Sequence, residues 1–161
     1  MAATFTWSES NGVGEAVTDG IVNLNVGNTD AKELVPADWP ILAGENSYEK
    51  WIRAKFGGTF TEISNMKLWK SAGAYKTGEA LKWNETSDNI YHQPVKTAST
   101  HATSDIPTSL PGTLNVHRST GENTMIAAGY TRYFVFQLQS TVLTPAGAVN
   151  TKTITFQYDE T

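Results

Sequence analysis

The chain has 161 residues, a formal net charge of −4, 17 % charged residues and no cysteine. Its length predicts one domain over residues 1–161 with a core of its own. The lack of cysteine excludes disulfides and thiolate metal sites, and the few, scattered basic residues argue against nucleic acid as the main partner.

The amino terminus lacks the features of a secretion signal. The stretch MAATFTWSESNG has no basic region and no apolar run, and no later run is as long as a membrane span. We therefore expect a protein that is synthesised in the cytoplasm of the cell that produces it and has no membrane partner. Asn84, Glu85 and Thr86 fit the glycosylation sequon, which matters only in a secretory pathway.

Alternating apolar residues open the chain. Thr4–Ser8 alternates around Phe5 and Trp7, and it predicts either a first strand or an ordered N-terminal arm within residues 1–12 that adds to a neighbour's sheet. After a glycine-rich turn, Ile21–Val26 alternates again and predicts a second strand.

The next stretch reads as a helical turn followed by loop. Thr29–Leu34 has a capping pattern and predicts a single helical turn, which Pro36 would end. The residues that follow, up to Gly44, include Trp39 beside Pro40 and predict a loop.

Ser47–Phe56 fits both helical and strand spacing. We favour a strand, because its aromatic and β-branched residues suit a pleated surface and two glycines follow it. Thr59–Lys70 contains two short runs whose alternation changes phase between Ile63 and Met66. Such a phase change predicts a bulge or kink.

The middle of the chain has a weaker pattern. Thr97–Ser109 is a low-complexity Ser/Thr stretch that predicts either an extended strand or an exposed loop. Thr113–Arg118 predicts a further short strand, with Leu114 and Val116 on one side.

Two strands are predicted at the carboxyl end, over Tyr130–Val142 and Thr151–Asp159. The large apolar residues on their inner sides are Phe134, Phe136, Leu138, Ile154, Phe156 and Tyr158. The link Leu143–Asn150 contains Pro145 and Gly147, so we expect the two strands to form a hairpin. Leaving its apolar side uncovered would forfeit on the order of 10 kcal/mol, so an opposing sheet is required.

Seven to nine short strands separated by turn signals predict an all-β fold with little helix. We expect an antiparallel β-sandwich of the jelly-roll or immunoglobulin-like kind.

No catalytic, cofactor or metal site is predicted. His92, His101 and His117 lack the close ligand pair typical of zinc sites. There is no G-x-S-x-G motif and no phosphate-binding glycine loop. Several glutamates could converge as in glycoside hydrolases, but solvated charges explain them better. The sequence therefore predicts a protein that is not an enzyme.

The five tryptophans are the other candidates for function. Indoles stack on sugars and are enriched in protein interfaces, although most tryptophans serve packing. Trp39, in a loop, and Trp7, near the terminus with Phe5, are the residues we expect at a contact with another molecule.

The order of these segments resembles a known class of proteins. The run SYEKWIRAKFGGTFTEISNMKLWKSAGAY, followed by YFVFQLQ, a TPAG loop and TITFQYDE, resembles small virion structural proteins of tailed bacteriophages. This resemblance implies a β-sandwich subunit on the outer surface of the phage head, a decoration or cement protein. It would bind the major capsid protein or other virion subunits as a homo-oligomer, with a trimer expected. The alternatives are a tail or baseplate accessory protein and a carbohydrate-binding adhesion module.

Overall fold

The computed structural model describes residues 2–147 and 150–161 of the chain. Within these residues the fold is all-β, without a helix, and every strand pair is antiparallel. The strands are β1 (Ala3–Asn11), β2 (Ala16–Asp19), β3 (Lys50–Gly58), β4 (Ile63–Ala72), β5 (Glu79–Glu85), β6 (Ser104–Asp105), β7 (Gly129–Tyr130), β8 (Phe134–Ser140) and β9 (Thr153–Glu160). The predicted fold class is therefore confirmed.

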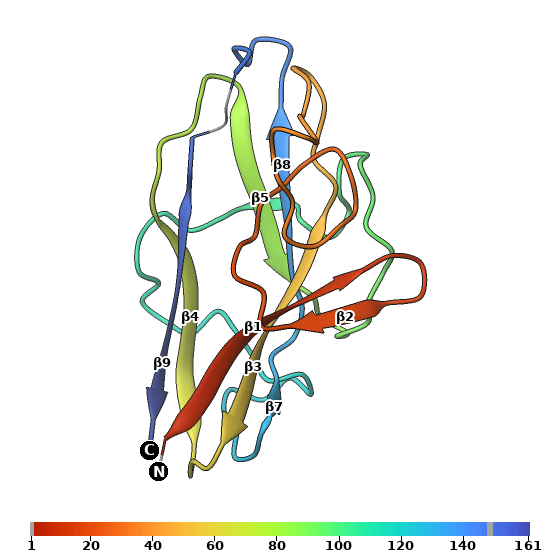
Figure 1. Ribbon diagram of the computed structural model, residues 1–161. Coiled ribbons are helices and arrows are strands. Elements are labelled where there is room, and N and C mark those ends of the chain that lie inside the picture. Colours follow the sequence, from red (N-terminus) through yellow and green to blue (C-terminus); the bar gives the residue numbers. More distant parts are fainter. Residues whose placement is uncertain (1, 148–149) are drawn as a thin grey trace.

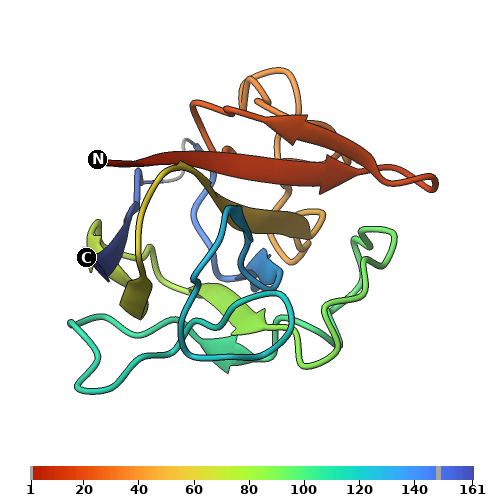
Figure 2. The same ribbon diagram turned by 90° about the horizontal axis from the view of Figure 1, so that it is seen from below.

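The strands form two sheets. The larger sheet has the order β2-β1-β3-β8-β5-β6, with β7 also paired to β3, and the smaller sheet consists of β4 and β9. Figures 1 and 2 show that the larger sheet curls and that the smaller sheet lies along its open side. The arrangement is consistent with a β-sandwich.

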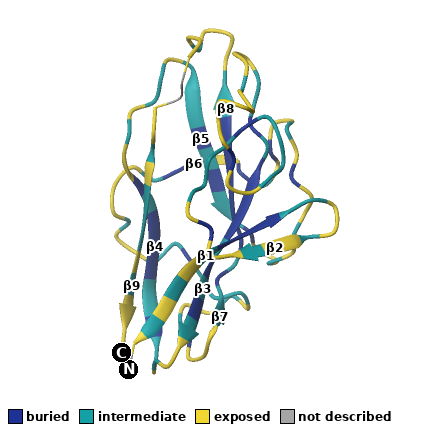
Figure 3. Cartoon of the chain, viewed as in Figure 1, coloured by how far each residue is buried: buried dark blue, intermediate teal, exposed yellow. Residues whose placement is uncertain are grey.

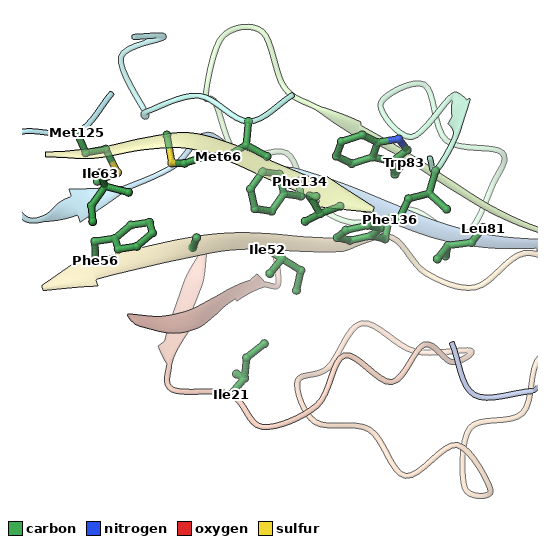
Figure 4. Packing of buried hydrophobic residues seen from close by; sticks show 14 of the residues in the cluster. Ile21, Ile52, Phe56, Ile63, Met66, Leu81, Trp83, Met125, Phe134 and Phe136 are labelled. Atoms are coloured by element: carbon green, nitrogen blue, oxygen red, sulfur yellow. The ribbon is translucent and has the colours of Figure 1, made fainter. Parts of the chain in front are cut away.

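The two sheets enclose the main core. Ile52 and Phe56 of β3 face Ile63 and Met66 of β4, with Phe134 of β8 beside them (Figure 4). All five side chains are fully buried, and each contributes roughly 1.5 to 3 kcal/mol of hydrophobic stabilisation. Figure 3 shows that the buried residues follow the middle of the strands, whereas the loops at both ends are largely exposed.

The predicted carboxyl-terminal hairpin is wrong. Both segments are strands, and their apolar residues do pack into the core. However, β8 pairs with β3 and β5, whereas β9 pairs with β4 in the other sheet (Figure 1). Alternation decides which side chains face the core but not which strand is the neighbour. Positions 148 and 149 of the predicted link lie outside the described residues.

Two predictions on the central strands are confirmed. The segment Ser47–Phe56 contributes most of β3, which is a strand and not a helix. The phase change after Ile63 is a bulge in β4, because the register with β9 shifts between Ser64 and Lys67. Asn65 lies at this bulge with a φ of 51°.

Three predicted elements do not form. Residues 21–26 are extended but belong to no strand, and Val22 is 86 % exposed. Residues 114–117 likewise lack a strand ladder, and the side chain of Asn115 bonds the backbone of β4 instead. The helical turn expected over Thr29–Leu34 is a turn at residues 32–33, where Glu33 has a φ of 47°. Within Thr97–Ser109, only β6 is a strand.

The amino-terminal segment is part of the chain's own sheet. From Ala3 to Ser10, β1 pairs with β3, so residues 3–11 form a strand rather than a free arm, and Met1 lies outside the described residues. Ala3 N–H donates to Glu160 Oε1 at 2.7 Å, which brings the two ends of the chain together (Figure 1).

No helix among the described residues is long and apolar enough to cross a membrane.

Candidate functional site

A group of exposed apolar side chains lies at the end of the molecule opposite the termini. We call this group the apolar tip; its members are Val35, Trp39, Leu42, Val142 and Leu143. They come from two loops at the top of Figure 1, over residues 35–44 and 141–147. Trp39 is 47 % exposed, Leu42 61 % and Val142 82 %. Exposed apolar side chains that gather at one end of a molecule often mark a site of contact with other molecules.

The two loops of the apolar tip are joined by hydrogen bonds. Gly44 N–H donates to Ser140 Oγ at 3.1 Å, and Ser140 Oγ donates to the carbonyl oxygen of Glu45 at 2.8 Å. Gly44 also lies against Val142, leaving only 3.0 Å between a Cβ built at position 44 and the nearest Val142 side-chain atom. These contacts hold the two loops of the apolar tip against each other.

A cavity of about 860 Å³ opens below the apolar tip. One wall consists of residues 23–26, 36–37 and 39–43, and the opposite wall of residues 146–147, 150–152 and 154. Leu81, Phe136 and Leu138 of the larger sheet also line it. We call it the seam cavity. It lies between residues 23–26, which follow β2, and the start of β9 in the smaller sheet. Its volume falls within the range of roughly 300 to 1,000 Å³ typical of ligand pockets.

The charged residues that line the seam cavity already have partners. Lys50 Nζ lies 2.6 Å from Glu9 Oε1, and Lys152 Nζ lies 3.0 Å from Glu79 Oε2. All four side chains are almost fully buried. The described part of the cavity wall therefore offers apolar and hydrogen-bonding groups rather than a free charge.

The structure separates the three residues predicted to make contacts. Phe5 and Trp7 are half-buried in β1 and pack within their own chain, with the Phe5 ring 5.5 Å from that of Phe156 and the Trp7 ring 6.2 Å from that of Phe134. Trp39 instead belongs to the apolar tip and lines the seam cavity. A contact of Phe5 or Trp7 with another subunit stays a prediction.

The histidines lie in two different surroundings. The rings of His92 and His101 lie 4.7 Å apart and both pack against the buried Trp51. His117 instead bonds to Glu85, with 2.6 Å between Nδ1 and Oε2. Residues 2–147 and 150–161 contain no group of three or more His, Cys, Asp or Glu side chains placed to hold a metal ion.

The carboxylates of Glu49 and Glu85 form hydrogen bonds with different residues. Glu49 Oε2 accepts from Trp51 Nε1 at 3.0 Å, and its other oxygen accepts from the hydroxyl of Ser99. Glu85 joins β5 to His117, and burial raises the pKa of its carboxyl group above the usual range. These contacts hold loops against the larger sheet.

The hydroxyl of Tyr133 donates a hydrogen bond to Glu15, and the guanidinium of Arg53 lies over the Tyr133 ring, 4.2 Å from its centroid. Burial is the main cause that raises the pKa of Tyr133 to about 12. This phenol therefore stays protonated and acts as a hydrogen-bond donor at neutral pH.

Sequence reasoning missed most of the apolar tip. Leu42, Val142 and Leu143 stand in segments whose proline and glycine content predicts loops, and a loop prediction carries no information on exposure. Large apolar residues inside such a segment are the one signal that could have identified them.

Comparison of the chain with protein-family models, with curated proteins and with solved structures gave no match.

Proposed function

We propose that this chain is a virion structural protein of a tailed bacteriophage, of the head decoration type, which binds the capsid lattice through its apolar tip without catalysing a reaction. The observation that carries this proposal is the exposure of Trp39, Leu42, Val142 and Leu143 together at one end of the molecule. The sequence resemblance to phage virion proteins supplies the kind of particle.

The size of the apolar tip fits a binding mode with many weak contacts. Full burial of one large apolar side chain contributes roughly 1.5 to 3 kcal/mol, and association costs at least about 4 kcal/mol in lost freedom. Five such side chains, partly buried, leave a modest affinity for one tip. A symmetric oligomer, with a trimer as the expected state, would multiply that affinity on a repeating lattice.

The apolar tip can be tested without disturbing the core or the seam cavity. Val142 and Leu143 are 82 % and 74 % exposed, and neither lines the cavity. We expect the double variant Val142→Ser/Leu143→Ser to fold normally and to lose at least about tenfold in affinity for heads assembled from the major capsid protein of the same genome. Cosedimentation of the purified protein with such heads measures this affinity.

The matched control removes an exposed apolar residue far from the apolar tip. Ile126 is 66 % exposed and precedes β7, near the end of the molecule that carries the termini (Figure 1). Ile126→Ser should bind heads like the unchanged protein. Equal losses in both variants would contradict a role for the apolar tip.

Binding assays with the same purified protein also distinguish the alternative partners. Binding to tails or baseplates but not to heads would replace the decoration role by a tail accessory role. Binding of the isolated protein to a glycan array, abolished by Trp39→Ser and without any binding to virion parts, would overturn the proposal in favour of a carbohydrate-binding module.

A further inference from the structure

We propose that Lys50 and Asn11 become joined by an intramolecular amide bond, which forms between Lys50 Nζ and Asn11 Cγ in the folded chain and releases ammonia. Glu9 moves the protons that this step requires. The modification goes beyond the function proposed for the apolar tip and does not depend on it. The ion pair between Lys50 and Glu9 is the state of the folded chain before the reaction.

The pairing of β1 with β3 brings the three side chains to one face of the larger sheet. Ser10 pairs with Trp51 at the end of this antiparallel ladder. Asn11 and Lys50 are the next residues of the two strands and therefore lie opposite each other. Residues opposite each other in such a pair have Cβ atoms about 4.5 to 5.5 Å apart. Glu9 stands two positions before Asn11, so its side chain lies on the same face.

One carboxylate oxygen contacts both reacting groups. Glu9 Oε1 accepts from Lys50 Nζ at 2.6 Å and from Asn11 Nδ2 at 3.0 Å. Formation of the amide requires that Nζ lose protons and that Nδ2 gain one before it leaves. Because the same oxygen contacts the two nitrogens, Glu9 can accept a proton from one and donate it to the other. This shared contact is the observation that carries the proposal.

The carboxylate that moves the protons is buried and only partly satisfied. Glu9 and Lys50 are 0 % and 1 % exposed, and Glu9 Oε2 has no hydrogen-bond partner among the described residues. Two charges removed from water are costly to keep, and transfer of one proton from Nζ to Glu9 neutralises both. This transfer leaves Lys50 as an amine, which is the form that attacks a carbonyl carbon.

Neighbouring residues fix both reacting groups. Asp30 Oδ1 accepts from Asn11 Nδ2 at 2.9 Å, and Asp30 Oδ2 accepts from Gly12 N–H at 2.8 Å. Lys50 Nζ also donates to the carbonyl oxygen of Ala31 at 2.6 Å. The carboxamide and the amine are therefore held next to each other by the folded chain, which makes the attack effectively unimolecular.

The atoms and protons of the step balance without an external reagent. Lys50 Nζ gives one proton to Glu9, and the resulting amine attacks Asn11 Cγ. Nδ2 takes this proton from Glu9, the Cγ–Nδ2 bond breaks, and ammonia leaves. Nζ loses a second proton to Glu9, and this proton departs with the ammonia as ammonium, which returns Glu9 to a carboxylate. The product is a neutral secondary amide, and no atom is oxidised or reduced.

The bond would tie down a segment that carries part of the apolar tip. Among the described residues, β2 is the only strand between Asn11 and Lys50, and the same segment contains Trp39 and Leu42. A covalent link between the two ends of this segment restricts the unfolded chain. The amide bond therefore opposes unfolding of the loop that leads to the tip.

Mass spectrometry of the purified full chain tests the proposal. We expect an intact mass below that of the sequence by one ammonia molecule. Trypsin does not cut after an acylated lysine, so digestion should yield residues 1–32 joined to residues 33–53 through Asn11 and Lys50. An intact mass equal to that of the sequence, with or without Met1, would overturn the proposal. Loss of water would overturn it as well, because the partner of Lys50 would then be a carboxylate.

Asn11→Ala removes the acyl group and leaves the buried pair of Glu9 and Lys50 in place. This variant should have the full mass of its sequence. The matched control Asn123→Ala, at an exposed position, should lose ammonia like the unchanged protein. Loss of ammonia in Asn11→Ala would overturn the proposal. The same variant is the reference in which the ion pair contributes to stability without the amide bond.

Lys50→Met separates the amide bond from another reaction of Asn11. Attack of the Gly12 nitrogen on Asn11 Cγ would also release ammonia and form a succinimide, but it does not need Lys50. Loss of ammonia in Lys50→Met, without a joined tryptic peptide in the unchanged protein, would assign the mass change to the succinimide and overturn the proposal.

Glu9→Gln tests the transfer of protons. Glutamine keeps the size of the side chain but does not relay protons, so we expect the bond to form at least about a hundredfold more slowly. Intact mass followed over time after cell-free synthesis measures this rate. A rate equal to that of the unchanged protein would overturn the role of Glu9. The joined tryptic peptide of the unchanged protein decides the amide bond itself even where a variant does not fold.

Discussion

Lys50 Nζ lies 2.6 Å from Glu9 Oε1, and both side chains are almost completely buried. The same ammonium group donates to the carbonyl oxygen of Ala31 at 2.6 Å. Lys50 therefore ties the loop after residue 28 to the first and third strands. This loop leads into the residues that form the apolar tip. The buried ion pair therefore helps to fix the position of that loop relative to the larger sheet.

Removing one partner of this pair should destabilise the fold. Lys50→Met leaves Glu9 with a buried negative charge, and we expect a loss of about 3 to 5 kcal/mol in the free energy of unfolding. The double variant Glu9→Leu/Lys50→Met removes both charges and should recover most of that loss. Urea unfolding measures both values, and an equal cost for the single and double variants would contradict the role of the unpaired charge.

The side chain of Asn115 should contribute to stability, because it bonds the backbone of β4 where no neighbouring strand does. Its side chain accepts from Leu68 N–H at 2.8 Å and donates to the carbonyl oxygen of Leu68 at 2.9 Å, as a neighbouring strand would. Asn115→Ala leaves both backbone groups of β4 without these bonds, so we expect a loss of about 1 to 3 kcal/mol in thermal or urea unfolding. Asn123→Ala, at an exposed position, should have little effect, and similar losses in both variants would disprove this role.

The bulge in β4 makes a prediction about backbone conformation. Asn65 has a φ of 51°, which asparagine and glycine tolerate better than other residues. Asn65→Ala should therefore lose about 1 to 2 kcal/mol, whereas Asn65→Gly should be nearly neutral. Asp159→Ala removes the hydrogen bond from the Asn65 side chain without changing the backbone. A loss in Asp159→Ala as large as that in Asn65→Ala would show that this bond, and not φ, matters.

Glu85 should make stability depend on pH. Burial, the largest cause, raises the pKa of its carboxyl group above the ordinary value of 4.5. The folded state then holds the proton more tightly than the unfolded chain, so Glu85 favours folding most below pH 4.5. That contribution is lost as the pH rises through the raised pKa. Glu85→Gln should therefore gain stability relative to the unchanged protein as the pH rises from 4.5.

A second glutamate provides a control of opposite sign. The hydroxyl of Thr120 is the main cause that lowers the pKa of the exposed Glu122 below its ordinary value of 4.5. This carboxylate favours folding above pH 4.5, and its contribution is lost as the pH falls through the lowered pKa. Glu122→Gln should therefore be slightly less stable than the unchanged protein at neutral pH, with the difference vanishing in acid. Urea unfolding from pH 3 to pH 8 compares both variants, and a common sign would contradict the assignment.

The sequence predicts which segments are extended better than it predicts their neighbours. The predicted strands around β1, β3, β4, β8 and β9 all form. Both faces of β8 are buried, because Phe134 and Phe136 face the main core whereas Val135 packs with Trp51 in a second cluster. The hairpin does not form because the two edges of β8 pair with β3 and β5, which leaves no edge for β9. Alternation in the sequence predicts the faces of a strand but not the strands beside it.

The candidate site was harder to predict than the fold. Trp39 could be singled out because a large aromatic residue in a proline-containing loop is unusual. The seam cavity could not, because it depends on the distance between residues 21–26 and β9, which are more than a hundred positions apart in the chain. Alternation at residues 21–26 predicts a strand, and its lack of a ladder becomes informative only in the folded molecule.

The hydrogen bond between Ala3 N–H and Glu160 Oε1 places both chain ends at the pole remote from the apolar tip. A short linker would therefore suffice to join the original ends in a circularly permuted molecule. Cargo fused at either end would project away from the apolar tip, so the molecule is suited to displaying two foreign domains side by side.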